Sequence, residues 1–342
     1  MVDRIWIHIG AEKTGTTTIQ KCLKLNRSKL ADRGVLFPRS VGEFNHIALA
    51  AYAMNDGRGI EELRIQSGVR NISEIPEFRD NLKASLIAET EASGCHTVVM
   101  SNEHCSSRLK SIEEIERLRD LCLSICSDIR IILYIRNPVD FFASWYSTAI
   151  ASGNTFDFPN PVPDHLLRAA DWLAMARDWA RVFGTHSVSV RRMDKSKLVD
   201  GDLLKDFFHT ISLPEFEFDV PPRTNEALPL KGLLFLQQIN DRIPRIVDNR
   251  MNEERGPIVD ALRAWPEKTK YAFSQEFSDE IEDYYKQSYE VLRQLYFGDD
   301  TSDLFSEPSS VGQANDIAPL TVDDCLDLAA HIWKYANSKV RR

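Results

Sequence analysis

The chain begins with a short apolar run that stops at a glycine and is followed by a helical pattern. Residues Ile5 to Ile9 are mostly β-branched or aromatic, which is typical of a strand, and Gly10 ends the run. From about Thr16 to Leu30 the apolar residues recur with the period of a helix. The pattern therefore predicts a strand, a loop and a helix at the start of the fold.

Strands and helices continue to alternate as far as about residue 225. The hydrophobic pattern predicts strands at 35–37, 96–100, 129–135 and 187–190, and helices at 77–92, 113–126, from Pro138 onward, at 164–183 and at 202–211. Residues 44–68 are expected to form loops with short helices, because glycines interrupt them. The run 129–135 is apolar on both faces, as buried parallel strands are. This order predicts an α/β fold with a parallel sheet covered on both faces.

The last third of the chain carries helical signals and few strand signals. Helices are expected near 230–242, 257–271 and 276–296, followed by a polar surface loop over 298–319 and an amphipathic helix over 322–338. We therefore expect an α/β core over residues 1–225 and a helical extension over residues 226–342. The length of 342 residues agrees with either one large domain or about two domains.

Charge and composition exclude several classes of protein. The chain has 42 Lys and Arg against 51 Asp and Glu, a net charge of −9, which argues against a general nucleic-acid partner. No secretory signal is visible at the N-terminus and no apolar run approaches the roughly 20 residues of a spanning helix, so we expect a cytoplasmic protein without membrane insertion. The six cysteines are too sparse for a disulfide scaffold. Cys122 and Cys126 lack a second ligand pair nearby, so buried thiols are favoured over zinc.

Two tryptophans and a lone histidine each have a functional and a structural interpretation. Trp172 and Trp179 lie seven residues apart on one helical face, which favours core packing over a ligand platform. His46 is a candidate for contact with a bound substrate, and a structural role is the alternative.

The loop after the first strand has the composition of an anion-binding loop. Several backbone N–H groups converge at the positive end of the following helix, and hydroxyl side chains add donors for a phosphate or sulfate. Gly10 and Gly15 have the spacing of a Walker A loop, but Thr16 follows Gly15 where that loop has its lysine, and the lysine stands at position 13. A glycine turn with a threonine cap is the structural alternative. The loop reads His8-Ile9-Gly10-Ala11-Glu12-Lys13-Thr14-Gly15-Thr16-Thr17-Thr18.

A second cluster of polar residues follows the strand at 129–135. An arginine at the carboxyl end of a buried strand presents a fixed fork of donors at the edge where ligands of α/β folds bind. Ser144 follows two helical turns after Arg136 and can share the same anion, whereas an ion pair between Arg136 and Asp140 is the alternative. The segment reads Arg136-Asn137-Pro138-Val139-Asp140-Phe141-Phe142-Ala143-Ser144-Trp145-Tyr146.

Together the two motifs resemble those of the sulfotransferase family that uses 3′-phosphoadenosine 5′-phosphosulfate (PAPS). The run Glu12-Lys13-Thr14-Gly15-Thr16-Thr17 is similar to the family's 5′-phosphosulfate loop, PKSGTT or PKTGTT, with Glu12 in place of the usual proline. The pattern RNPxDxxxSxY is similar to its 3′-phosphate motif, in which the arginine and the serine hold the 3′-phosphate. The resemblance covers residues 5–38 and 129–150 well, extends in general terms to about 225, and is weak beyond.

The resemblance implies a P-loop NTPase-like three-layer α/β/α fold, PAPS as donor and 3′,5′-diphosphoadenosine (PAP) as product. Sulfuryl transfer resembles phosphoryl transfer in its demand for positioning and positive charge, and no metal is required. Lys13 is then expected to supply the cation at the bridging oxygen. The 5′-phosphate and 3′-phosphate sites are expected to use Thr14, Gly15, Thr16, Thr17 and Thr18, and Arg136 and Ser144, respectively.

The acceptor hydroxyl needs a general base, for which Glu103 is the first candidate. It follows directly after the strand 96–100, at the same edge as the donor loop, and many carbohydrate sulfotransferases are similar in using a glutamate. His104 is the rival base. The structural alternative is that Glu103 caps the next helix and His104 is solvated.

Several points stay open from the sequence. Arg223 resembles a late loop residue that closes over the donor or the acceptor. Arg191 and Arg192, which follow the strand at 187–190, are further candidates at this edge, and solvated side chains are the alternative. A small-molecule or glycan acceptor is expected, with a saccharide hydroxyl favoured, and the oligomeric state is unknown. The competing functions are a P-loop kinase acting on a nucleotide or sugar and a non-catalytic protein that kept the nucleotide fold.

Overall fold

The structure is a computed structural model that describes residues 2–222, 227–247, 250–298, 300, 302–312 and 318–340. The chain divides into two compact units that interleave along the sequence. Unit 1 comprises Met1–Arg136, Asp171–Pro222 and Ser288–Ser306, and unit 2 comprises Asn137–Ala170, Arg223–Gln287 and Glu307–Arg342. The expected core of 1–225 with an extension over 226–342 stays a prediction.

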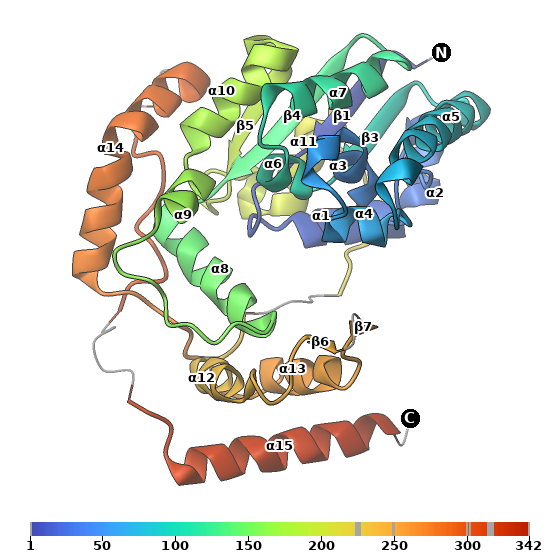
Figure 1. The fold of residues 1–342 in the computed structure, drawn as a ribbon. Helices are drawn as coiled ribbons and strands as arrows, with labels where there is room; N and C mark the ends of the chain where they lie inside the picture. The colour runs from blue at the N-terminus through green and yellow to red at the C-terminus, as the bar shows by residue number, and fades with distance from the viewer. Residues whose placement is uncertain are drawn as a thin grey trace. The chain divides into compact units, whose positions relative to one another are not determined.

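Unit 1 is built around a five-stranded parallel sheet (Figure 1). The strand order is β2-β3-β1-β4-β5, so β1 lies in the centre. Ile7 of β1 is in register with Met100 on one side and with Ile131 on the other. Because every strand runs in the same direction, all five carboxyl ends meet at one edge. The strands are β1 (Arg4–His8), β2 (Val35–Leu36), β3 (Thr97–Ser101), β4 (Ile129–Ile135) and β5 (Val188–Arg192).

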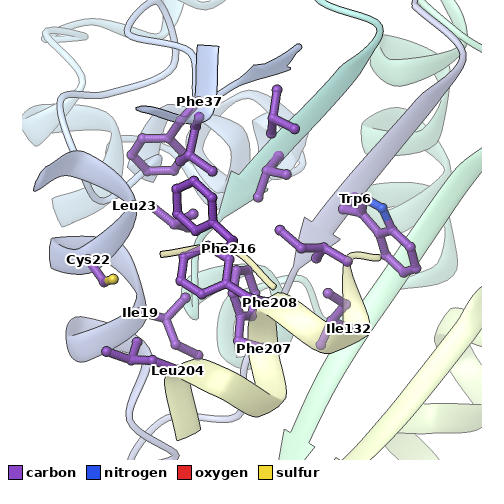
Figure 2. Close-up of a cluster of buried hydrophobic side chains, with 14 of the residues drawn as sticks. Trp6, Ile19, Cys22, Leu23, Phe37, Ile132, Leu204, Phe207, Phe208 and Phe216 are labelled. Carbon is purple, nitrogen blue, oxygen red and sulfur yellow. The ribbon is translucent and has the colours of Figure 1, made fainter. Parts of the chain in front are cut away.

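Helices α1 (Thr16–Leu25) and α11 (Leu203–Thr210) cover one face of this sheet and contact each other. Figure 2 shows their apolar side chains gathered against alternate residues of the strands. Trp6 of β1 and Ile132 of β4 pack in one buried cluster with Ile19, Leu204 and Phe207. The twofold alternation along a strand explains why every second residue faces these helices.

The other face of the sheet is covered by α7 (Ile112–Leu123) and α10 (Trp172–Phe183), which contact β4 and each other. Ile5 and Ile7 of β1 are fully buried and, by the same alternation, face this side. Helix α3 (Ile47–Ala53) contacts α5 (Ile75–Ser93), α6 (His104–Arg108) and α7. The predicted α/β class, with a parallel sheet between two layers of helices, is confirmed. Shorter elements are α2 (Arg27–Ala31), α4 (Glu62–Gln66), η1 (Asp56–Arg58), η2 (Ile72–Glu74), η3 (Thr185–Ser187) and η4 (Val199–Gly201).

The first predicted helix is interrupted at Asn26. The sequence pattern predicted one helix from Thr16 to Leu30, but α1 ends at Leu25 and α2 begins at Arg27. The side chain of Asn26 donates to Asp219 O at 2.9 Å and accepts from Asp219 N at 2.7 Å. This buried amide therefore binds a distant backbone segment, an interaction that helical periodicity does not reveal.

The predicted helix over 164–183 is likewise two helices, α9 (Asp164–Ala169) and α10. Asp171 starts the second one, because its carboxylate accepts a hydrogen bond from Ala174 N at 3.0 Å as an N-cap. The predicted helix was therefore wrong at this junction, where a local cap restarts the backbone.

Unit 2 is mainly helical and has its own core. Tyr146, Leu233, Leu262 and Leu328 belong to one buried cluster drawn from four helices. A two-residue antiparallel pair, β6 and β7, was not predicted, and α13 ends well before the expected residue 271. The elements are α8 (Pro138–Ala151), α9, α12 (Leu230–Ile239), β6 (Ile246–Val247), β7 (Arg250–Met251), α13 (Arg255–Arg263), the first half of α14 (Gln275–Phe297) and α15 (Val322–Val340).

Among the described residues, none of the helices combines the length and apolarity that a bilayer crossing demands.

Candidate active site

The carboxyl ends of β1 and β4 form the topological switch point of the sheet. The chain leaves β1 toward β2 on one side, whereas it leaves β4 and returns as β5 on the other side. Ligands of open α/β sheets bind where neighbouring connections diverge in this way. The hydrogen bond from Ala11 N to Tyr134 O, 3.2 Å long, extends the contact between the two strands into the loop after β1. The predicted donor loop and Arg136 both start here.

The loop between β1 and α1 holds a tight conformation that depends on glycine. Gly10 and Gly15 have φ values of 41° and 81°, and Lys13 has a φ of 69°, all in the left-handed region. A Cβ on Gly10 would lie 2.7 Å from Thr16 Oγ1, and one on Gly15 would collide with Leu203. These two positions therefore require glycine. The loop is thus held in a conformation in which neither position has room for a side chain.

Several donors of this loop are not used by the residues that the structure describes. The N–H groups of Thr16 and Thr17 have no acceptor in the part of the chain that the structure describes. Thr16 Oγ1 is buried and has no hydrogen-bond partner among those residues either. Thr14 differs, because its hydroxyl donates to Ala11 O at 2.6 Å and closes the turn. Unused donors at the positive end of a helix fit a phosphate or sulfate group.

Arg136 is held against the same loop. Its Nη1 atom donates to Lys13 O across 3.3 Å, and its own carbonyl accepts from Trp172 Nε1 at 2.9 Å. Trp172 is fully buried, as is Trp179, so the expected core role of both is confirmed. Sequence reasoning missed the bond from Trp172 to Arg136. The indole N–H of a buried tryptophan needs an acceptor, and this requirement was the only indication of the bond in the sequence.

The expected roles of Ser144 and Arg223 at the 3′-phosphate stay predictions. Ser144 is a half-buried residue of α8 in unit 2, whereas Arg136 is the last residue of that stretch of unit 1. Their shared role stays a prediction, as does the alternative ion pair of Arg136 with Asp140. Arg223 lies outside the described residues.

The end of β3 brings Glu103 and His104 to the same edge of the sheet. Asn102 N donates to His8 O at 2.9 Å, and Ser106 donates to the carbonyl of Gly10, so this segment is bonded to β1 and to the donor loop. Glu103 is at the N-cap position of α6, but its carboxylate makes no capping hydrogen bond. The capping role considered for Glu103 is therefore absent.

The carboxylate of Glu103 instead bonds to the helix that follows the donor loop. Gln20 of α1 donates from Nε2 to Glu103 Oε2 at 2.7 Å. Gln20 is one helical turn beyond Thr16 and was not predicted as a site residue. Its signal was a lone amide among apolar residues on the buried face of α1, beside Ile19 and Leu23.

His104 and Glu12 lie close together at the mouth of the loop. His104 Nδ1 is 3.8 Å from Glu12 Oε1, which is an ion-pair distance but not a hydrogen bond. Both side chains are half-buried. Glu12 is the residue that replaces the proline of the resembling motif, and here its carboxylate faces a histidine.

His46 and His8 are both buried and are joined through one serine. Ser101 N donates to His46 Nδ1 at 3.2 Å, and Ser101 Oγ is 2.8 Å from His8 Nδ1. Burial lowers the pKa of each histidine to about 3, with the charge of Arg27 adding to the effect at His46. His46 also stacks on Phe37 with 4.3 Å between ring centroids. This geometry favours the structural alternative for His46, and its contact with an acceptor stays a prediction.

Arg191 and Arg192, at the end of β5, are held by acidic side chains. Arg191 Nε lies 3.0 Å from Oδ1 of the buried Asp206, which also accepts from Tyr134 OH at 2.6 Å. Arg192 Nη2 is 2.6 Å from Asp300 Oδ2. These ion pairs link the end of β5 to other parts of unit 1.

Cys122 is buried, as expected, whereas Cys126 is only half-buried. All six are free thiols, and four of them are buried. Burial raises the pKa of Cys22 and of Cys122 to about 12, so both are held as neutral thiols. No group of three or more metal-ligating side chains occurs within the described stretches.

Comparison with known proteins gives matches among solved structures. Neither a family model nor a curated protein matches the chain. A sulfotransferase from Alicyclobacillus acidocaldarius, known from its crystal structure, matches 70% of this chain and 93% of its own, with a TM-score of 0.41 and 14% sequence identity. At this TM-score and identity the likeness assigns neither a family nor an activity to the chain.

Proposed function

We propose that the protein is a sulfotransferase that moves the sulfuryl group of PAPS to an acceptor hydroxyl. The observation that carries the proposal is the hydrogen bond between Arg136 and the carbonyl of Lys13 at the switch point. It joins two cationic residues from separate motifs around a loop in which the N–H groups of Thr16 and Thr17 and the Thr16 hydroxyl are unused among the described residues. Such a constellation suits a small ligand with more than one anionic group.

The donor site is assigned residue by residue on this basis. The backbone N–H groups of Gly15, Thr16 and Thr17 and the hydroxyls of Thr16, Thr17 and Thr18 would hold the 5′-phosphate. The N–H group of Thr18 already donates to Gly15 O at 2.9 Å. Thr14 would act through its backbone, because its hydroxyl closes the turn. Arg136, together with Ser144 and Arg223, would hold the 3′-phosphate.

The reaction forms a bond between the acceptor oxygen and sulfur and breaks the bond between sulfur and the bridging oxygen of the 5′-phosphate. PAP leaves with that oxygen and its electron pair, and Lys13 would stabilise the negative charge that develops there. The acceptor hydroxyl gives its proton to a general base, Glu103 or His104. The scheme requires no metal ion.

The acceptor is proposed to be the hydroxyl of a saccharide or glycoconjugate. The support is the carboxylate of Glu103 at the sheet edge, because carboxylate bases are typical of the carbohydrate enzymes that the motifs resemble. A small phenol or a peptide alcohol would use the same proton transfer and is a competing acceptor in the assay.

Titration with two nucleotides tests the proposal. We expect PAP to bind tightly and ATP with magnesium to have no effect, and labelled PAPS to transfer its sulfuryl group to a member of an acceptor panel. Binding of ATP with magnesium, without binding of PAP, would instead identify a P-loop kinase. Binding of PAP without any transfer from PAPS would favour a non-catalytic protein.

A further inference from the structure

We propose that Gln20 is a positioning residue that holds the carboxylate of Glu103 in place for proton abstraction. The inference rests on the proposed sulfuryl transfer and extends it to a residue outside both recognised motifs. It also favours Glu103 over His104 as the general base.

The contacts of Gln20 define this role. Its side chain is 1% exposed, and its Nε2 atom lies 2.7 Å from Glu103 Oε2 and 3.4 Å from Ser101 O. One amide group thus spans the end of β3 and the carboxylate that follows it. Glu103 itself is half-buried, so its carboxyl group is not sealed inside the protein.

The hydrogen bond limits the motion of the carboxylate. A glutamate side chain has three rotatable bonds, and a fixed donor restricts the positions of its carboxylate group. Because no capping bond competes for the carboxylate, Gln20 is its identified partner among the described residues.

The location of Gln20 joins the base to the donor loop. Gln20 and Thr16 lie one turn apart on the buried face of α1, and Thr16 begins that helix directly after Gly15. A shift of α1 on donor binding would therefore move Glu103 with it. His104 has no comparable anchor, since its Nδ1 atom is buried without a hydrogen bond within the described residues.

The test is a double-mutant cycle on turnover with Gln20→Met and Glu103→Ala. Methionine keeps the length of the side chain and removes the donor. We expect Gln20→Met to lower kcat about 10- to 100-fold, with the KM for PAPS and the affinity for PAP nearly unchanged. In the Glu103→Ala background the same substitution should have no further effect on kcat, because its partner is gone. Gln20→Asn, whose amide is one methylene too short to reach, should behave like Gln20→Met.

Asn26→Ala is the matched control, because Asn26 is also a buried amide of the same helix region but bonds to Asp219 and not to Glu103. It should lower the thermal midpoint and leave kcat unchanged below that midpoint. Labelled PAPS with a mixture of saccharides and p-nitrophenol serves as the assay.

The outcomes separate the two proposals. Suppose that the wild type transfers sulfuryl groups, but the fold-losses of kcat from Gln20→Met and Glu103→Ala multiply in the double variant. Gln20 then has a merely structural role and this inference is overturned. If Gln20→Met and Asn26→Ala lower kcat equally, the same conclusion holds. A wild type that binds ATP with magnesium and never uses PAPS would overturn the proposed function itself, and this inference with it.

Discussion

Arg136 donates a hydrogen bond to the backbone carbonyl of Lys13, although 123 positions separate the two residues in the sequence. The bond fixes the position of a guanidinium relative to a left-handed turn of the donor loop. It means that a change at Arg136 also acts on the loop.

Lys13→Ala is expected to remove turnover and to change PAP affinity only modestly, because the lysine would act on charge that develops during transfer. A drop in kcat of at least about 100-fold is expected, measured with labelled PAPS. Lys29→Ala is a suitable control, because Lys29 is an exposed lysine paired with Asp219.

Arg136→Ala is expected to act mainly on donor binding, because it removes a bidentate cation and the bond to the loop. We expect the Kd for PAP, measured by calorimetry, to rise about 10- to 100-fold. Equal losses of kcat and of PAP affinity in both variants would contradict this division of roles between Lys13 and Arg136.

Gly15→Ala is expected to destabilise unit 1 and to weaken donor binding. Gly94→Ala is the matched variant, since Gly94 also has a left-handed φ, 65°, but a Cβ there meets no atom within 4 Å. Gly94→Ala should cost about 1–2 kcal/mol of unfolding free energy from backbone strain alone. Gly15→Ala should cost more because of Leu203, and Leu203→Ala should recover the difference. Identical costs from urea denaturation of the two alanine variants would show that the collision is absent.

Stability should fall between pH 6.5 and about 3 because of the two buried histidines. Their pKa values are lowered from 6.5 to about 3, so the unfolded chain binds protons in this range and the folded chain does not. Stability is therefore complete above pH 6.5 and is lost as the pH falls. At pH 5 each histidine should lower the unfolding free energy by about 2 kcal/mol.

The variant His46→Asn isolates one of these contributions, because asparagine offers an acceptor near the position of Nδ1 without titrating. Its urea-denaturation midpoint should depend less steeply on pH than that of the wild type over the same range. An unchanged slope would mean that His46 is protonated in the folded protein.

Asp206→Ala is expected to destabilise the protein by about 3–5 kcal/mol, because it leaves Arg191 without its buried carboxylate partner. Asp206→Asn should cost less, since the amide still accepts from Tyr134. Lys29→Ala breaks only an exposed pair and should leave the thermal midpoint nearly unchanged. Calorimetry of the three variants checks this order, and equal midpoints would contradict it.

Local patterns were sufficient to predict a parallel sheet and the alternation of strands and helices along the chain. The strand at 129–135 was predicted with its observed bounds, because an apolar run bounded by polar residues leaves little choice. The errors fall where a side chain makes a distant or local bond that overrides periodicity, as at Asn26 and at Asp171. The pair β6 and β7 is too short to carry a period.

The candidate site was predictable to the extent that its residues follow strand ends. Glu103 and Arg136 were found because parallel strands deliver their carboxyl ends to one edge. Gln20 was missed because it lies within a helix, where its place on the apolar face was its only signal and its hydrogen bond to Glu103 was not predictable. The burial of His46 was equally beyond the sequence, since it depends on Phe37 and Ser101 from two other segments.

The hydrogen bond from the Trp172 indole to the carbonyl of Arg136 gives the protein an intrinsic optical reporter. Indole fluorescence responds to the field and the polarity around the ring, and this ring is fully buried with its N–H directed at the backbone of a proposed donor-binding residue. Occupation of Arg136 by an anion would change that field without exposing the ring. Emission from Trp172, isolated by replacing the other five tryptophans with phenylalanine, would then follow donor binding in real time without a label.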